Sequence, residues 1–316
     1  MNTRCMHTSA LYDPRTFLAA LFTLSASPWA AADVTSPVLK INASAETTPV
    51  ATQALRGNIS VLTGSGGNIA VLSSADGKLL VDSGIAVSRP RLAAALDAIS
   101  PAPLEFVVNT HYHWDHTDGN AWTNQEGATI VAHENTLKRL AAGTRVIEWG
   151  YTFPPLAGAG LPTVLVRNEQ TIPFHGETVI LKHYGAGHTD TDLSVYFKNA
   201  DVLQMGDIWW NGHYPFIDYG AGGSIDGMIR WTNACLASVS ANTLIVPGHG
   251  PVGDRTQLLA YRDMLVAVRQ NVARLKKEGK TLAEVVAAKP TAAYDAQYGD
   301  FVIDPAFFTQ LVYMGL

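Results

Sequence analysis

The chain has 316 residues, of which 47% are hydrophobic and 16% are charged. This composition is that of a globular protein and excludes a chain that is disordered throughout. The chain carries 22 basic and 27 acidic residues, a net charge of −5, which argues against nucleic-acid binding because nucleic-acid binders usually show a basic excess. Two cysteines and ten histidines make histidine the residue type to follow.

Residues 1–32 have the pattern of a secretory signal peptide. Arg4 and Arg15 are followed by an apolar run, and Ala30–Ala32 supplies the small residues that a signal peptidase needs. The run is shorter than the roughly 20 apolar residues of a transmembrane helix. We therefore expect cleavage after Ala32, a periplasmic or secreted mature chain 33–316, and no membrane span in that chain.

The cysteines are not expected to form a disulfide in the mature chain. Cleavage removes Cys5 and leaves Cys235, which lies in the largely apolar stretch 231–239. No cysteine or histidine is close to Cys235 in sequence. Cys235 is therefore predicted to be a small buried core residue and not a metal ligand.

The first half of the mature chain reads as a loose arm followed by strands and helices. We expect the arm over 33–53, a hairpin from 68–73 and 79–82, and a helix over 89–99, where apolar residues form one stripe. Further strands are predicted at 104–108 and 128–132, and a helix at 135–142.

The second half repeats this style after a loop rich in glycine and proline. The pattern predicts a loop over 150–168, strands at 171–174, 179–183, 193–197, 202–205 and 244–246, and helices at 225–238, 256–278, 282–288 and 305–313. Strands followed by helices, twice, favour an α/β sandwich. No linker separates the halves, so 33–316 is predicted to be one domain.

The densest cluster of chemically active side chains is His111-Tyr-His-Trp-Asp-His116, directly after the apolar strand 104–108. Imidazole and carboxylate groups suit zinc and other borderline divalent metals. A tight loop at the end of a strand can point His111 and His113 at one metal ion, while Asp115 and His116 reach a second. An exposed polar loop without metal is the alternative.

Three more candidates stand in similar contexts: His188, Asp207 and His249 each follow an apolar strand and a glycine. Glycine lets the backbone turn sharply where a strand ends. Ligands from several strand ends can therefore converge at one edge of a sandwich. Taken singly, a histidine after a strand is more often structural.

With this set of motifs, the chain from Asn68 to Pro251 resembles the metallo-β-lactamase superfamily. The resemblance implies a four-layer αββα sandwich with a two-metal hydrolytic site at one edge. It assigns His111, His113 and His188 to the first metal, Asp115, His116 and His249 to the second, and Asp207 to a bridging position.

The resemblance also implies a reaction. Two zinc ions, with iron or manganese as alternatives, would share a hydroxide that attacks an electrophilic carbonyl or phosphorus. Asp115 would orient that hydroxide or accept its proton. We therefore expect a hydrolase that acts on a small-molecule ester, lactone, thioester or amide. The sequence leaves the oligomeric state open.

Asp207 indicates to which branch of the superfamily the chain is most similar. Zinc β-lactamases generally lack a bridging aspartate there, whereas glyoxalase II enzymes, lactonases and phosphodiesterases of the fold carry it. β-Lactam hydrolysis is therefore not expected as the main reaction and is left open as a weak side activity, and the export signal disfavours glyoxalase II. A true metallo-β-lactamase and an iron-dependent redox member similar to persulfide dioxygenases stay as alternatives. Residues 207–218 resemble those of periplasmic bacterial relatives.

Residues 208–220 are expected to form a loop beside the metals. The candidates for lining a substrate pocket are Trp114, Trp209, Trp210, His213 and Tyr214, although packing as a lid or core edge is the alternative. Thr189 and Asp190 follow a predicted ligand and could orient it. His133, His175 and His183 are predicted to be structural.

Overall fold

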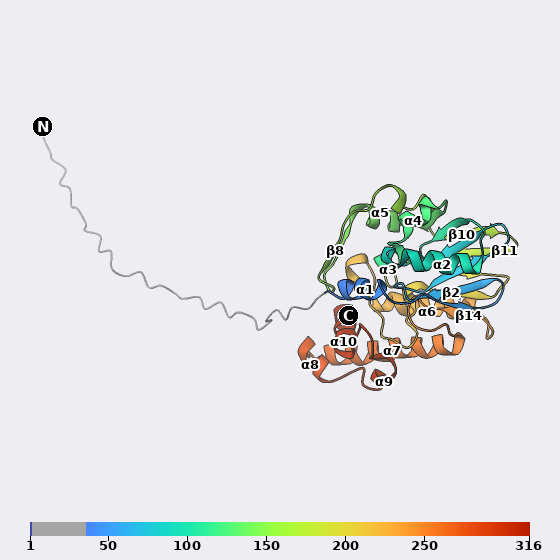
Figure 1. Ribbon diagram of the computed structural model, residues 1–316. Coiled ribbons are helices and arrows are strands. Elements are labelled where there is room, and N and C mark those ends of the chain that lie inside the picture. Colours follow the sequence, from blue (N-terminus) through green and yellow to red (C-terminus); the bar gives the residue numbers. More distant parts are fainter. Residues whose placement is uncertain (2–35) are drawn as a thin grey trace. The chain divides into compact units, whose positions relative to one another are not determined.

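The computed structural model describes Met1 and residues 36–316 (Figure 1). Apart from Met1, the predicted signal peptide lies outside the described residues. Within the described part of the chain, no helix combines the length and apolarity that crossing a membrane requires.

The first sheet has seven strands in the order β1-β2-β3-β4-β5-β6-β9. Strands β1 to β4 form antiparallel pairs, whereas β4, β5, β6 and β9 run parallel. The bounds are β1 Ala51–Ala54, β2 Ile59–Thr63, β3 Ile69–Ser73, β4 Lys78–Val81, β5 Leu104–Val108, β6 Thr129–His133 and β9 Val164–Val166. The parallel strands end at the same edge, which places the loop after β5 there.

The second sheet has five strands in the order β10-β11-β12-β13-β14, antiparallel except for the parallel pair β13 and β14. The bounds are β10 Glu169–Phe174, β11 Glu177–Lys182, β12 Ser194–Phe197, β13 Val202–Gln204 and β14 Leu244–Val246. A separate hairpin is made of β7 Thr144–Val146 and β8 Tyr151–Phe153.

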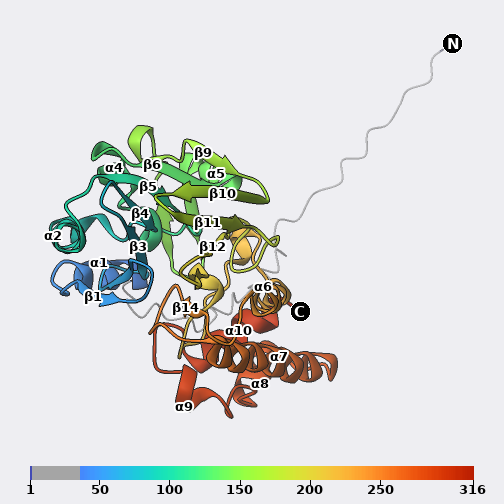
Figure 2. The same cartoon turned by 90° about the vertical axis from the view of Figure 1, so that its right-hand side faces the viewer.

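Three apolar clusters define four layers (Figure 2). The cluster between the two sheets includes Val81 and Val108 from the first and Leu181 and Val195 from the second. On the outer face of the first sheet, α2 (Arg89–Ile99) packs Leu92 onto the strands. Helices α6 (Ile225–Ser238) and α7 (Arg255–Lys277) cover the second sheet. The predicted αββα sandwich is confirmed.

Helices α5, α6, α7, α8 and α10 begin after a residue whose side chain caps a free backbone N–H group. Asp254 and Gln257 form a capping box at the start of α7, and Thr281 and Glu284 form another before α8. The remaining helices are α1 Pro37–Ala45, α3 Trp114–Thr117, α4 Asn120–Gln125, α5 Glu134–Ala142, α8 Leu282–Ala287, α9 Asp295–Tyr298 and α10 Pro305–Met314. The predicted helices over 89–99, 225–238, 256–278 and 305–313 are confirmed within two residues.

Two predicted irregular segments differ in the structure. In the arm predicted over 33–53, residues 37–45 form α1 and residues 51–54 form β1; strand β2 follows at 59–63. The side chain of Val38 is fully buried against the body of the protein. The loop predicted over 150–168 contains β8 and β9. In each case tertiary contacts order a short segment whose own periodicity is weak.

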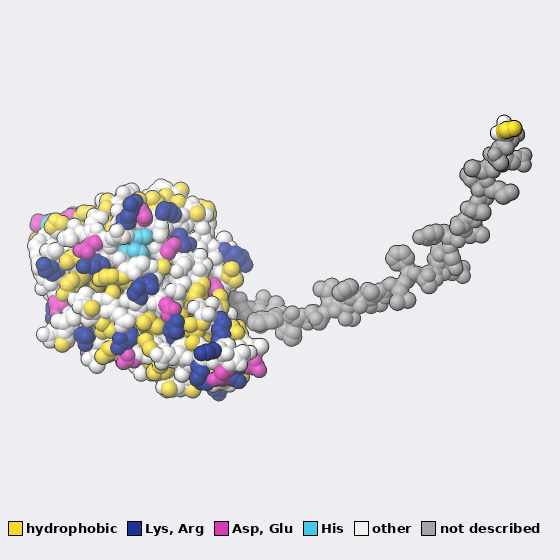
Figure 3. All heavy atoms as spheres, turned by 180° about the vertical axis from the view of Figure 1, so that it is seen from behind, with side chains coloured by type: hydrophobic (Ala, Val, Ile, Leu, Met, Phe, Trp, Pro, Cys, Tyr) yellow, Lys and Arg dark blue, Asp and Glu magenta, His cyan; other side chains and the backbone are white. Residues whose placement is uncertain are grey.

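Cys235 lies in α6 and is fully buried, as predicted for a core residue. Burial raises the pKa of its thiol to about 12, so the thiolate is disfavoured at neutral pH. On the face of the molecule in Figure 3, acidic and basic side chains are interspersed, and that face carries no broad region of one charge.

Candidate metal centre

The structure brings all seven predicted ligands together from separate loops. His111 and His113 follow β5, and Asp115 and His116 lie in α3. The loop between β11 and β12 supplies His188, and the segments after β13 and β14 supply Asp207 and His249. Their ligand atoms form two groups, one of His111, His113, His188 and Asp207 and one of Asp115, His116 and His249.

In the first group, three imidazoles meet around one point. The Nδ1 atom of His113 lies 3.0 Å from Nε2 of His111 and 2.9 Å from Nε2 of His188. The Oδ2 atom of Asp207 lies 3.7 Å from the former Nε2 and 3.6 Å from the latter. All four side chains are buried, so these atoms face one another away from bulk solvent.

The second group shares Asp207 with the first. Oδ1 of Asp207 lies 3.1 Å from Nε2 of His116, and Oδ2 lies 3.4 Å from Nε2 of His249. The Oδ2 atom of Asp115 is 3.4 Å from that His249 nitrogen and 3.7 Å from the His116 nitrogen. Asp207 therefore stands between the two groups, where a carboxylate can bridge two cations.

Acceptors behind the histidines fix their tautomers. Nδ1 of His188 donates to the backbone oxygen of Phe216 at 2.8 Å, and Nδ1 of His116 donates to Oδ2 of Asp82 at 2.7 Å. Nε2 of His113 donates to Oδ2 of Asp218 at 3.0 Å. Since the outer nitrogen of each ring carries the proton, the inner nitrogen of a neutral ring presents a lone pair to the site.

This donor set fits a metal. The inner nitrogens of His113 and His188 face each other at 2.9 Å, and buried lone pairs in this arrangement are costly without a cation. Burial lowers the pKa of His188 to about 4, which favours the neutral ring that a metal binds. Nε2 of His116 and Oδ1 of Asp207 are buried and lie 3.1 Å apart without hydrogen-bond geometry, and neither atom has another hydrogen-bond partner. Imidazoles with carboxylates suit zinc, iron or manganese.

The carboxylates favour positive charge in the second group. Burial alone would lower the pKa of His116, but Asp207, Asp115 and Asp82 outweigh burial and raise it well above the usual value. Burial would also lower the pKa of His249, but Asp207 and Asp115 outweigh burial and raise it to about 9. A bound cation and these protons would satisfy the same carboxylates, so they compete for the site.

Gly248 lets the backbone pass close to Asp207. A Cβ atom at this position would lie 2.0 Å from Oδ1 of Asp207 and 2.7 Å from the backbone carbon of Gly206, so the carboxylate would have to move. We expect Gly248→Ala to weaken metal binding by about 10- to 100-fold, the range for disturbed ligand orientation. Metal content after dialysis against buffered zinc measures this effect.

Gly160→Ala is the matched control, because a Cβ there meets its nearest atom at 3.6 Å, an ordinary contact. Equal zinc retention by both variants would contradict the proposed dependence on the position of Asp207.

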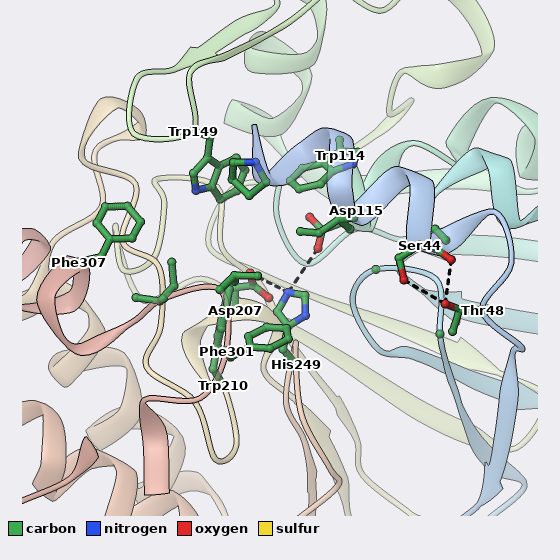
Figure 4. Close-up of a pocket in the computed structure, with 17 residues that line it drawn as sticks. Ser44, Thr48, Trp114, Asp115, Trp149, Asp207, Trp210, His249, Phe301 and Phe307 are labelled. Atoms are coloured by element: carbon green, nitrogen blue, oxygen red, sulfur yellow. Dashed lines mark hydrogen bonds and ion pairs between the residues drawn. The ribbon is translucent and has the colours of Figure 1, made fainter. Parts of the chain in front are cut away.

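A cavity of about 240 Å³ opens directly over the second group. Asp115, Asp207 and His249 form its polar floor. Figure 4 shows Trp114 and Trp149 on one side of these groups, and Trp210 and Phe301 on the other. The cavity is therefore walled largely by aromatic rings next to the metal ligands.

The structure divides the predicted pocket residues. Trp114 and Trp210 line the cavity, but Trp209 and Tyr214 do not. Both are fully buried in the apolar cluster that includes residues of α6, α7 and α10, and the hydroxyl of Tyr214 donates to Oδ1 of Asp295 at 2.9 Å. His213 is not in the cavity wall; its ring stacks on Phe301 with centroids 4.4 Å apart.

Several lining residues escaped the sequence analysis. They are Trp149 before β8, the α1 residues Pro37, Ile41, Ser44 and Ala45, and, from the segment 301–307, Phe301, Val302, Ile303 and Phe307. None stands near the ligand motifs in the sequence, so no local pattern marks them.

The structure also reassigns the orienting role. Thr189 and Asp190 were expected to orient His188, but Thr189 bonds to Asp192 at 2.7 Å, and Asp190 pairs with Arg139. The acceptors that hold the ligand rings are instead Asp82, Asp218 and the Phe216 backbone oxygen. Asp82 and Asp218 are both buried. In the sequence, Asp82 ends the predicted strand 79–82 shortly before Gly84, a context similar to that of the ligands, whereas no such pattern marks Asp218.

The other histidines make structural contacts. The rings of His133 and His183 stack with centroids 4.1 Å apart, and each ring bonds to a backbone oxygen. Nε2 of His175 lies 2.7 Å from Oε1 of Glu105. These contacts agree with the structural roles expected for these three residues.

Comparison with known proteins places the chain in a family. Residues 62–271 match the model of the metallo-beta-lactamase superfamily. The probable metallo-hydrolase YqgX of Bacillus subtilis is 32% identical over 82 residues, 26% of this chain and 36% of that relative. The match thus covers well under two thirds of that relative's own length.

Solved structures show the same fold. A metallo-beta-lactamase from Pontibacter korlensis is 19% identical, with a TM-score of 0.56 over 68% of this chain and 98% of that chain. The stereoselective inverting sec-alkylsulfatase Pisa1 from Pseudomonas sp. is 15% identical, with a TM-score of 0.63 over 84% of this chain and 50% of that chain. The matched range 62–271 covers more than half of the chain and contains all seven candidate ligands, so the chain belongs to the metallo-beta-lactamase superfamily.

Proposed function

We propose that the protein is a dinuclear zinc-dependent hydrolase of a small ester, lactone, thioester or amide. The observation that carries this proposal is the pair of ligand groups that share Asp207 beneath an accessible cavity. The name of the Bacillus subtilis relative, a probable metallo-hydrolase, supports the reaction class.

The residues at the floor of the cavity suit hydrolysis. Zinc ions held by the two groups would lower the pKa of water and polarise the bond to be cleaved. Asp115 lies in the cavity wall, where its carboxylate can orient a water molecule and accept its proton. Although burial opposes ionisation, His116 and His249 lower the pKa of Asp115, so the carboxylate is available as a base.

A metallo-β-lactamase and an iron-dependent redox enzyme are the competing functions. The Pontibacter korlensis structure carries the β-lactamase name, which supports β-lactam hydrolysis as a side activity. The shared position of Asp207 favours hydrolysis of other esters and amides as the main reaction. A persulfide dioxygenase-like enzyme would use iron in the same His/Asp set.

We also propose that the chain acts outside the cytoplasm on a small molecule. This part of the proposal rests on the signal-like pattern of residues 1–32. Cell fractionation of the full chain, with N-terminal sequencing of the product, tests export and the cleavage position after Ala32. A full-length chain recovered only from the cytoplasm would overturn it.

The decisive experiment combines metal analysis with a substrate panel. Purified protein is expected to hold close to two zinc ions per chain and to hydrolyse at least one member of a panel of esters, lactones, thioesters, amides, phosphodiesters and β-lactams. Stoichiometric iron with a coloured spectrum would favour the redox alternative, because zinc is colourless. Protein without any bound transition metal would refute the proposal.

A further inference from the structure

We propose that the cavity above the metal centre selects an uncharged substrate with an extended apolar chain, and that α1 and residues 301–307 form the binding walls for that chain. This inference rests on the proposed hydrolase function. It narrows the ester and lactone class to molecules with a hydrophobic acyl or alkyl group.

The first observation is the chemistry of the walls. Above the floor of metal ligands, the cavity is lined by Ile41 of α1, by the rings of Trp114, Trp149 and Trp210, and by the segment that starts at Phe301. Burial of apolar surface against such walls is favourable in proportion to the area removed from water. The binding free energy is therefore expected to increase with the length of the apolar chain of the substrate.

Three polar side chains in the walls, those of Ser44, Thr48 and Trp114, already have hydrogen-bond partners, whereas Nε1 of Trp210 is buried without one. The hydroxyl of Ser44 lies 3.1 Å from that of Thr48, which also donates to the backbone oxygen of Ser44 at 2.8 Å. Nε1 of Trp114 donates to Oδ1 of Asn42 at 2.9 Å. These groups satisfy one another, so a polar substituent on the substrate would lose its water without gaining a partner from them.

None of the described residues that line the cavity is a lysine or an arginine, which disfavours substrates with an anionic group at the far end of the chain. Arg139 lines the neighbouring cavity on the other side of Trp114, where its guanidinium is held by Asp190 at 2.6 and 2.7 Å. An anionic group on the distal end of the chain would thus be desolvated without a countercharge.

The rim of the cavity is also apolar. Phe301 and Val302 line the cavity, are adjacent in sequence and are still 44% and 42% exposed. An apolar chain that leaves the cavity would continue across these two side chains. Exposed apolar surface next to a binding groove is typical of a site that is covered by its ligand.

The walls are also anchored. The hydroxyl of Ser36 donates to the backbone oxygen of Trp149 at 2.7 Å, and the hydroxyl of Ser88 donates to that of Ala45 at 3.1 Å. These bonds hold both ends of α1 against the body of the protein. The cavity is therefore preformed, and binding does not require ordering of this helix.

The test uses γ-lactones with alkyl substituents from methyl to octyl, and a matched series with a carboxylate at the end of the chain. For the alkyl series, kcat/KM is expected to rise about fourfold per methylene until the cavity is filled. A terminal carboxylate is expected to lower kcat/KM by at least tenfold. A flat dependence on chain length, or equal rates for both series, would overturn the inference.

Val302→Lys is expected to shift the ratio of the two activities toward the carboxylate series by at least tenfold, because it places a cation at the rim. Leu165→Lys is the matched control, since Leu165 is 45% exposed on β9 and does not line the cavity. The ratio cancels any common effect on the metal centre. An unchanged ratio in Val302→Lys would contradict the assigned walls.

A binding measurement separates this inference from the proposed function. Three tryptophans line the cavity, so the purified zinc-loaded protein titrated with 1-butanol or 1-decanol should report binding through its intrinsic fluorescence. Tighter binding of 1-decanol that Val302→Lys weakens and Leu165→Lys preserves supports the apolar site even if no lactone is hydrolysed. Equal binding of the two alcohols overturns the inference. Absence of any hydrolysis with intact decanol binding refutes only the hydrolase.

Discussion

Asp115→Asn is expected to lower kcat by about 10²- to 10⁴-fold on any substrate that the protein hydrolyses, the usual range for loss of a general base. The amide has the shape of the carboxylate but cannot accept a proton at neutral pH. The asparagine side chain is expected to keep the neighbours of Asp115, which packs closely against the backbone of Gly66: a Cβ added to Gly66 would lie 2.6 Å from the Cβ of Asp115. Steady-state kinetics on the best substrate measures the loss.

Asp118→Asn is the matched control on the next turn of the chain. Oδ2 of Asp118 accepts from the backbone N–H of Ala86 at 2.8 Å and lies outside both ligand groups. It should retain activity. Zinc content is measured in both variants, since Asp115 also belongs to the second ligand group. Full activity of Asp115→Asn on every hydrolysed substrate would contradict the catalytic role of its carboxylate.

Removal of metal is expected to abolish activity and to lower the melting temperature by about 10 °C or more. A ligand at 1,000 times its Kd stabilises the folded state by about 4 kcal/mol. For chains near this size, each kcal/mol changes the melting temperature by about 2–4 °C. Differential scanning calorimetry with and without a zinc chelator measures the shift, and added zinc should reverse it.

The physical reason is the unfavourable arrangement left behind by the metal. Without a cation, Nδ1 of His113 lies 3.0 Å from Nε2 of His111 and 2.9 Å from Nε2 of His188. His175→Ala serves as the control variant, because its ring bonds to Glu105 and belongs to neither ligand group, so the same loss of melting temperature on chelation is expected in it. An identical melting temperature for zinc-loaded and stripped protein would show that the seven side chains do not hold a stabilising ion.

The ligands of the metal centre could be predicted from the sequence because each of them follows a recognisable apolar strand. His111, His113, Asp115 and His116 fall within six residues directly after a buried strand. His188, Asp207 and His249 each follow a strand and a glycine. A buried strand can be read from a few residues, and the ends of neighbouring strands meet at an edge, so local patterns were sufficient to bring these residues together.

Most of the residues that line the cavity could not be predicted from the sequence. Its walls combine α1, Trp149 and residues 301–307, which are brought together only by the packing of the whole domain. In the aromatic stretch 209–216, Trp209, Trp210 and Tyr214 were all predicted to line the pocket. Trp209 and Tyr214 are buried in the core, and Trp210 lines the cavity. Neighbouring aromatic residues have the same composition whichever way each side chain points, so composition does not separate pocket from core.

The range shared with the family, 62–271, contains all seven ligands, whereas α1 and residues 301–307 lie on either side of it. Substitutions in these flanking segments would change which molecules enter without moving a ligand. Selection can therefore act on substrate choice and on reaction chemistry through different parts of the gene. Exchange of α1 and the 301–307 segment between relatives offers a direct route to new specificities on an unchanged metal centre.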